Sequence, residues 1–409
     1  MSFAQRAIYT RASIFWHSCF CFMFSLVQAS AAIDIIFDYS YDSGNYFSDD
    51  RKYIMEQVAY VFESRMGGES FAGYRPSEDL GLNSITGLGL NFTSPSSSAT
   101  LQPAVGSTTS DGNVIGKANE LIIFLGAKSI GGSTLASAGQ TGRTGYSAGS
   151  GSDLSAMQNA LNAKNSTTNY EPIAGSSQVN TNKTFYYDTD LTTHTDALSS
   201  GKTDFYTVMV HEIGHVMGFQ ANNAWNANKS GSFWTGANAK AEYNGQNVPL
   251  YGTSHWDLPT DGGAGNSGSL NPAHVGCACH PSMLPSIGIN TRSSFSDLDF
   301  ALLKDIGYSI SASPVGTNIG GTYTDATWGG TYDVPVSQTY ADWLAAGGGN
   351  GGGGVGGGVG GGGVVVVGGS VAPEPAEIFP FISFIALAVL AWRRRKRSFG
   401  MVKNEASSM

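Results

Sequence analysis

The feature that most constrains this chain is a pair of histidines four residues apart, His211 and His215, inside an apolar stretch. On an α-helix, residues at this spacing lie on one face, so both imidazoles can reach the same metal ion. Glu212 then lies beside the ion, where its carboxylate can take a proton from metal-bound water. Because the pattern is short, the surrounding sequence is needed to show whether it marks a metal site.

The neighbouring residues predict a buried helix over 205–217. Asp204 is a suitable N-cap, and Gly218 can adopt the left-handed conformation that ends a helix. Apolar residues cover much of the helix surface, and Gly214, which has no Cβ, lets another element pack closely on the ligand-bearing turn. The alternative is a core helix with two hydrogen-bonded histidines, but its glutamate would then also need a buried partner.

The residues from His211 to Gly218 resemble the first eight positions of the extended motif of the metzincin zinc peptidases. The resemblance implies an α+β zincin domain over residues 32–308 that binds Zn²⁺. Such a domain has a mixed twisted sheet, an active-site helix, and a C-terminal helix after a Met-turn. The usual third histidine falls at position 221, which is Ala221. Either the site is degenerate, or its third ligand comes from farther along the chain.

His255 is the favoured third ligand. Leishmanolysin-like metzincins have an insertion after the glycine and a third histidine followed by tryptophan, and His255-Trp256 is similar. The intervening residues 220–250 are rich in Asn, Gly and Ala, which predicts a surface excursion. His274 and His280 remain alternatives for the third ligand.

Pro281-Ser-Met-Leu-Pro285 resembles a Met-turn, which would place Met283 beneath the zinc as a soft apolar floor. Some metzincins have a tyrosine at the position of Pro285 that assists the transition state, and this sequence lacks it. A helix is expected to follow, with Ser296 and Asp299 forming a capping box and Gly307 ending it. We expect its role to be structural.

The rest of the domain is predicted to hold strands and a helix in an order similar to metzincin domains. Gly/Ser-rich loops are expected over 77–112 and 131–151. Alternating apolar residues predict strands over 33–39, 120–125 and 184–187, and an amphipathic pattern predicts a helix over 50–66.

The N-terminus resembles an export signal. Residues 1–31 carry a basic start, an apolar core too short for a comfortable membrane span, and a small-residue cleavage site at Ala29-Ser-Ala31. A retained N-terminal anchor is the alternative interpretation. We therefore expect the following domain to be exported through the cytoplasmic membrane to the cell surface or the extracellular space.

The C-terminus resembles a PEP-CTERM sorting signal, which implies an exosortase-type processing enzyme as a partner. Residues 371–397 combine Pro-Glu-Pro, an apolar run and a basic cluster, and residues 398–409 would form a cytoplasmic tail. A plain C-terminal anchor is the alternative, and in either case only this segment would engage the membrane. Residues 347–370 are nearly all Gly and Val, typical of a flexible linker, and 309–346 form a small extension.

Cysteine usage and charge limit the remaining function classes. Cys277 and Cys279 are two residues apart, a spacing that strains a disulfide, so no disulfide framework is expected. With His280 they could bind a soft metal. The favoured interpretation is a loop in which the two cysteines are reduced or bridged to each other. The formal net charge of −9 argues against nucleic-acid binding.

The combined prediction is an exported zinc metalloendopeptidase acting on protein or peptide substrates. His211, His215 and His255 would hold zinc through neutral nitrogens, and Glu212 would act as the general base. The competing hypothesis is a non-catalytic cell-surface or biofilm-matrix protein built on a zincin scaffold. Hydrolysis of non-peptide amide bonds is a third possibility.

Overall fold

The computed structural model describes residues 33–66, 70–193, 201–258, 281–289, 292–315, 318–320, 322–324 and 331–348. The predicted signal peptide, the C-terminal sorting signal, the tail and almost all of the Gly-rich linker lie outside these ranges. All described residues belong to one compact unit. No helix within the described ranges is long and apolar enough to cross a membrane.

A four-stranded mixed sheet with the order β1-β5-β9-β6 forms the centre of the domain. Strands β1 (Asp34–Asp38) and β9 (Ala174–Asn180) run parallel to β5 (Glu120–Lys128). Strand β6 (Ala136–Gln140) pairs antiparallel with β9 and ends the sheet, so its outer edge has no partner among the described strands.

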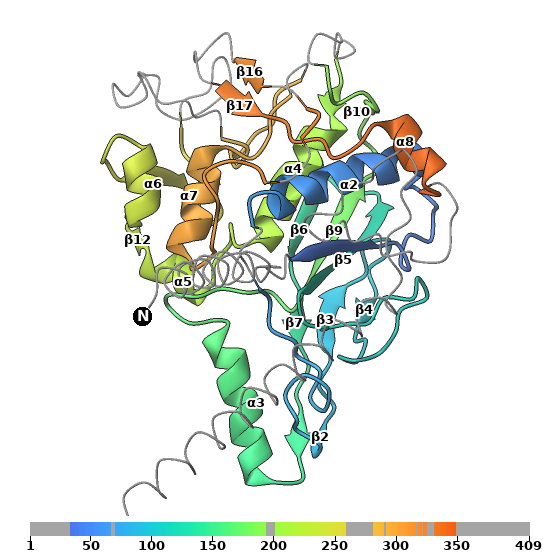
Figure 1. The fold of residues 1–409 in the computed structure, drawn as a ribbon, viewed down its shortest axis with the longest axis vertical. Coiled ribbons are helices and arrows are strands. Elements are labelled where there is room, and N and C mark those ends of the chain that lie inside the picture. Colours follow the sequence, from blue (N-terminus) through green and yellow to red (C-terminus); the bar gives the residue numbers. More distant parts are fainter. Residues whose placement is uncertain are drawn as a thin grey trace, which may run out of the picture. The chain divides into compact units, whose positions relative to one another are not determined.

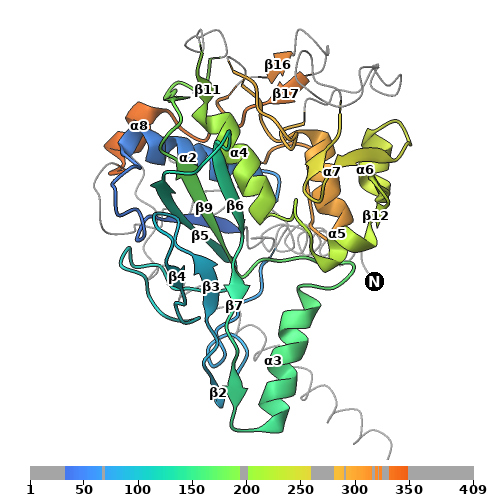
Figure 2. The ribbon, with the colours of Figure 1, turned by 180° about the vertical axis from the view of Figure 1, so that it is seen from behind.

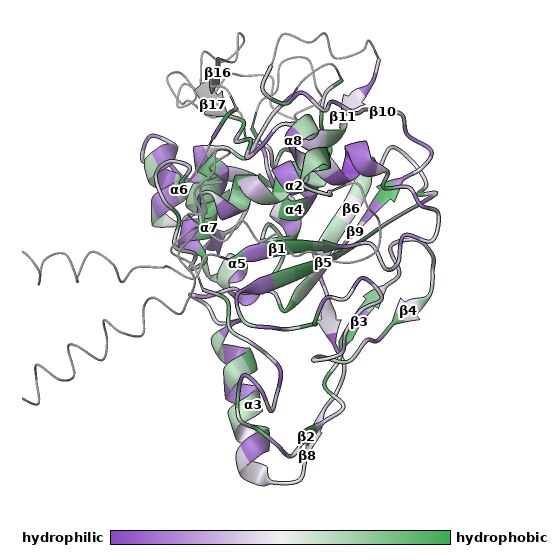
Figure 3. Ribbon diagram, turned by 45° about the vertical axis from the view of Figure 1, so that its right-hand side comes forward, coloured by the Kyte–Doolittle hydropathy of each residue, from purple (hydrophilic) through white to green (hydrophobic). Residues whose placement is uncertain are grey.

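Two helices cover one face of this sheet, and a smaller sheet covers the other. Helices α2 (Asp49–Glu63) and α4 (Phe205–Val216) lie on the first face (Figures 1 and 2). Strands β3 (Leu90–Thr93), β4 (Thr100–Leu101) and β7 (Gly142–Arg143) lie on the second. Central strand β5 therefore buries both of its faces, which explains its continuous apolar run (Figure 3).

Several smaller elements extend this framework. Helix α3 (Gly151–Ala163) stands beside the β2–β8 pair and buries only Met157 and Leu161 (Figure 2). The elements β2 (Ile85–Thr86), β8 (Ser147–Ala148), β10 (Phe185–Tyr186) and β11 (Thr203–Asp204) form two short pairs, and β11 leads directly into α4.

Residues 220–256 form a folded insertion between α4 and the third predicted ligand. It contains α5 (Asn223–Ala227), β12 (Lys229–Ser230), β13 (Phe233–Trp234), α6 (Ala237–Glu242), β14 (Val248–Tyr251) and β15 (His255–Trp256). Its four strands form one sheet in chain order. The prediction of a surface excursion holds only in part. Residues 230–233 and 244–247 are exposed, but Trp225, Trp234 and Tyr243 are fully buried in the main hydrophobic core.

The chain after the insertion closes the same core. Helix α7 (Asp297–Asp305) packs beside α6, and the extension contains β16 (Thr322–Thr324), β17 (Thr331–Asp333) and α8 (Tyr340–Ala345). On α8, Trp343 lies with its ring centroid 6.0 Å from that of Tyr53 on α2. The extension therefore packs on the domain that precedes it.

The structure confirms a mixed α+β fold and most of the predicted elements. Helix α4 begins at Phe205, with the Asp204 side chain accepting from the Thr207 N–H, and Gly218 follows with φ +130°. The capping box at the start of α7 is also present. Helix α2 ends at Glu63, three residues before the predicted end, and a last turn over 64–66 continues it, in which the Ser64 and Met66 N–H groups donate to the carbonyls of Tyr60 and Phe62. The predicted loop over 77–112 contains strands β2, β3 and β4, and the predicted loop over 131–151 contains β6, β7 and β8. Neither β9 nor α3 was predicted.

Gly214 allows Met283 to pack directly on α4. A Cβ at Gly214 would lie 2.5 Å from the Met283 Sδ and 2.8 Å from the Phe295 ring. We therefore expect Gly214→Ala to destabilise the domain by about 1–3 kcal/mol, although alanine favours helix by about 1 kcal/mol. Denaturant unfolding measures the change. Gly151→Ala on α3, where no atom lies within 4 Å, is the control and should not destabilise.

Candidate metal centre

Three histidines from two distant parts of the chain meet at one point. His211 and His215 lie one turn apart on α4, and their Nε2 atoms are 3.1 Å apart. His255, at the start of β15, places its Nε2 3.3 Å from that of His211. Among the described residues, this trio is the one group of His, Cys, Asp or Glu side chains arranged to hold a metal ion.

The opposite nitrogen of each ring is held by a neighbouring oxygen. The Nδ1 of His211 lies 2.7 Å from the Ser282 carbonyl oxygen, and the Nδ1 of His215 lies 2.6 Å from that of Phe219. The Nδ1 of His255 lies 3.0 Å from the Ser254 hydroxyl, which can also accept a hydrogen bond. Carbonyl oxygens only accept, so His211 and His215 carry their proton on Nδ1.

This tautomer leaves lone pairs on the converging Nε2 atoms. Two neutral imidazoles cannot hydrogen-bond through two lone pairs, so the 3.1 Å separation of His211 and His215 is repulsive without a cation between them. Tetrahedral zinc ligands about 2.0–2.1 Å from the ion lie about 3.3–3.4 Å from one another. The spacings of 3.1 and 3.3 Å from His211 are close to this value, and all three ligand atoms lie within 4.8 Å of one another.

Burial keeps these imidazoles neutral. Desolvation lowers the pKa of His211 and His215, and it lowers the pKa of His255 to about 4. The other two imidazoles lower the pKa of His211 further, because nearby positive charges repel one another. Neutral imidazole is the form that binds metal ions.

Glu212 lies beside the histidines with one oxygen lacking a protein partner. The residue is buried, its carboxylate accepts from the Ala138 N–H on β6, and its Oε2 has no hydrogen bond. Burial raises the pKa of Glu212 to about 8, although the Ala138 N–H opposes the shift. A nearby cation would lower this pKa, since opposite charges favour the ionised form. The orphaned oxygen thus fits a water molecule or a cation.

The predicted Met-turn lies against the ligand-bearing turn of α4. Met283 is fully buried and touches the site of the missing Gly214 side chain. Its carbonyl oxygen accepts from the Trp256 N–H at 2.9 Å, and the preceding carbonyl, of Ser282, holds His211. The segment therefore orients two of the three histidines through its backbone.

Asp299 of α7 joins these parts through its buried carboxylate. Its Oδ1 accepts from the Trp256 indole N–H at 2.8 Å, and its Oδ2 accepts from the Ser282 N–H at 2.8 Å. Ser296 adds two more hydrogen bonds to Oδ2. Burial raises the pKa of Asp299 to about 6 against these donors, which leaves it ionised at neutral pH. The sequence marked Asp299 only as a capping residue.

A second carboxylate on α7 holds the rest of the insertion. Asp305 accepts from the Trp234 indole N–H at 3.0 Å, and from the backbone N–H groups of Asn238 and Ala239 at 2.8 and 3.0 Å. These backbone groups belong to the first turn of α6, so Asp305 caps that helix from outside it. Helix α7 therefore fixes both the body and the end of the insertion that carries His255.

Ala221, which follows the turn after α4, is exposed. The alternative ligands His274 and His280, together with Cys277 and Cys279, lie outside the described residues. Sequence analysis did not identify the Phe219 carbonyl or the Ala138 N–H as part of the site. Main-chain groups carry no residue-type signal, so only the fold reveals them.

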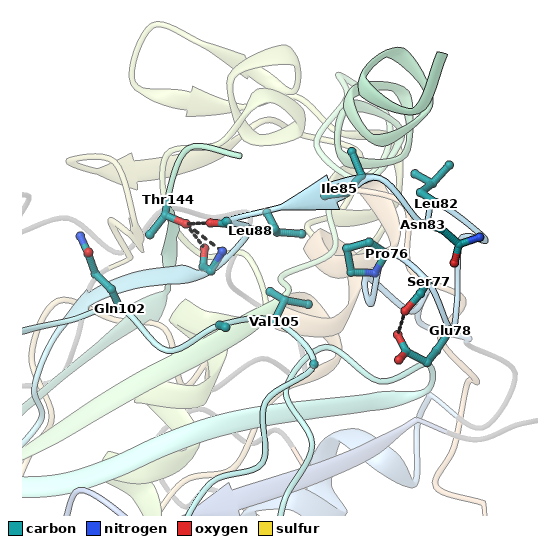
Figure 4. A pocket seen from close by; sticks show the side chains of 14 residues that line it. Pro76, Ser77, Glu78, Leu82, Asn83, Ile85, Leu88, Gln102, Val105 and Thr144 are labelled. Carbon is teal, nitrogen blue, oxygen red and sulfur yellow. Dashed lines mark hydrogen bonds between the residues drawn. The ribbon is translucent and has the colours of Figure 1, made fainter. Parts of the chain in front are cut away.

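A separate hollow of about 510 Å³ lies between the 76–89 loop and residues 102–106 (Figure 4). It contains no histidine or cysteine, and its one carboxylate, Glu78, is exposed and accepts from the Ser77 hydroxyl. Thr144 at its edge satisfies the backbone of Gly87 and Gly89. Nothing in this hollow resembles the chemistry of the histidine cluster.

Comparison with protein-family models, with curated proteins and with solved structures finds no match to this chain.

We expect Asp299→Asn to loosen the third ligand. If the amide oxygen replaces Oδ2, the amide N–H₂ faces the Trp256 indole N–H, and a buried donor loses its acceptor. The loss should lower the free energy of unfolding by about 1–3 kcal/mol and weaken metal binding. Urea unfolding and zinc titration measure both effects. Asp297→Asn on the same helix is the control, since its side chain is 60% exposed.

His255 should also make metal-free stability depend on pH. Its pKa is lowered from 6.5 to about 4 on folding, so between these values the unfolded chain binds more protons. The wild type should thus lose stability relative to His255→Gln as pH falls from about 7 to 4.5. Urea unfolding in the presence of chelator measures this difference. A difference that is constant across this range would contradict the burial of a neutral imidazole.

Proposed function

We propose that this chain is a zinc-dependent endopeptidase with a metzincin-like catalytic domain. One observation carries the proposal: three imidazoles converge through Nε2, and backbone carbonyls hold Nδ1–H in two of them. A core pair of histidines has no need for such convergence. Three protein nitrogens leave a fourth position open, as catalytic rather than structural zinc sites do.

The residues around the centre supply the other parts of a hydrolytic site. Bound zinc would lower the pKa of a coordinated water and polarise a carbonyl group. Glu212, which is buried and has a free Oε2, would accept the water proton and return it to a leaving amine. Met283 and Phe295 pack against the ligand-bearing turn and keep it rigid.

The edge of the main sheet supports a peptide as the substrate. Strand β6 ends the sheet, and the Ala138 N–H on that strand reaches Glu212. The outer edge of β6 thus faces the general base, and an extended peptide can pair with such an edge through its main chain. Pairing would bring a peptide bond beside the centre independently of its side chains. This favours peptide over non-peptide amide hydrolysis.

Export remains part of the proposal. The leader at 1–31 and the sorting signal at 371–397 would place the domain outside the cytoplasmic membrane, with an exosortase-type enzyme processing the tail. Cell-surface or extracellular protein is then the available substrate.

Glu212→Gln tests the catalytic role. The amide keeps the size of the side chain but cannot accept the water proton, so we expect zinc to stay bound while casein hydrolysis falls by about 10²–10⁴-fold. Zinc content and peptide release are measured on the same preparation. Glu78→Gln, an exposed carboxylate in the separate hollow, is the matched control and should retain full activity.

The result distinguishes the enzyme from a scaffold protein. Hydrolysis by the wild type should stop with chelator and return with added zinc. Bound zinc without any hydrolysis would favour the non-catalytic surface protein, and unchanged cleavage by Glu212→Gln would remove Glu212 from its role.

A further inference from the structure

The sheet that delivers His255 has two chemically different faces. Paired residues across an antiparallel sheet lie on the same face, and faces alternate along each strand. The pairs Trp234↔Val248 and Leu250↔Trp256 form the inner face, and all four residues are at most 4% exposed. The pairs Phe233↔Pro249 and Tyr251↔His255 form the outer face.

The outer face combines exposed aromatic rings with a residue of the candidate metal centre. Phe233 is 45% exposed and Tyr251 is 51% exposed, whereas the other aromatic residues of this sheet are buried. Tyr251 lies directly opposite His255, so their Cβ atoms are about 5 Å apart. His255 in turn reaches His211 through Nε2. The exposed rings thus begin beside the metal centre.

Distances along the sheet match those of an extended peptide. Pro249 and Tyr251 are two residues apart on β14, or about 7 Å, which is also the spacing of alternate side chains in an extended chain. Phe233, on the neighbouring strand β13, lies opposite Pro249 and extends the apolar surface sideways. Ser230 of β12 pairs with Phe233 on the same outer face, and none of the five residues there is an acid, a lysine or an arginine. Single exposed hydrophobic residues need no explanation, but a continuous surface beside a metal centre indicates binding.

We propose that Phe233, Pro249 and Tyr251 form a substrate subsite that receives a large apolar, preferably aromatic, side chain near the scissile peptide bond. The inference rests on the proposed peptidase function and adds its side-chain preference. Pairing at β6 would hold the peptide main chain, whatever its sequence. The outer face of the insertion would then select the side chain.

Peptide binding tests this subsite separately from catalysis. Zinc-loaded full chain carrying Glu212→Gln is titrated with fluorescent peptides that contain a single Phe or Ala at each successive position. Fluorescence anisotropy gives the affinity without turnover. We expect Phe at one position to strengthen binding about tenfold over Ala, and Tyr251→Ala or Phe233→Ala to abolish most of that difference.

Two further variants test whether the aromatic surface causes the preference for Phe. Tyr251→Phe keeps the aromatic surface and should retain the preference, which separates packing from any role of the hydroxyl group. Leu154→Ala on α3 removes an equally exposed side chain, 45% exposed, from another part of the domain and should change nothing. Because Tyr251, Phe233 and Leu154 are all exposed, circular dichroism should show the same fold for each variant.

The outcomes for the subsite and for the peptidase are distinct. If binding prefers Phe and depends on Tyr251, but the wild type hydrolyses no peptide, the result would support the subsite and overturn the peptidase function. Metal-dependent hydrolysis with the same preference in wild type, Tyr251→Ala and Phe233→Ala would overturn the subsite alone. The absence of both binding and hydrolysis for every peptide would overturn both.

Discussion

The candidate site depends on hydrogen bonds from imidazole Nδ1–H groups to backbone carbonyl oxygens. Ser282 and Phe219 provide these oxygens, and they fix which nitrogen of His211 and His215 carries the proton. The other nitrogens must then present lone pairs to the same point, where they repel one another unless a cation is bound. Every chemical role assigned to Glu212 or to a bound water follows from that geometry.

The rest of the fold holds the two carbonyls and the third imidazole in place. Gly218 turns the chain so that Phe219 reaches back to His215, and Asp299 clamps the Ser282 and Trp256 segments to α7. Figures 1 and 2 show α4 between β6 on one side and the insertion with α5, β12 and α6 on the other. Glu212 is thus contacted from the sheet, whereas His255 arrives from the insertion.

Sequence patterns predicted the elements whose residues carry a periodic or capping signal. Helix α4 has both caps and a spacing of two histidines, so its bounds were predicted to within one residue. Strand β6 has the sequence Ala-Ser-Ala-Gly-Gln, which lacks the residues that favour strands. Its pairing with β9 stabilises it as a strand, and the sequence pattern does not show that pairing. In β9, Gly175 is required where α4 packs, since a Cβ there would lie 2.5 Å from Val216. The sequence of the insertion is mostly polar, because only a few large residues, such as Trp225 and Trp234, are buried in the core.

X-ray absorption at the zinc edge of the purified, zinc-loaded chain tests the central claim most directly. The geometry predicts three imidazole nitrogens at about 2.0–2.1 Å and one oxygen ligand, with one imidazole lost in His255→Ala. A signal from sulfur ligands, or from two imidazoles in the wild type, would contradict a centre built from His211, His215 and His255.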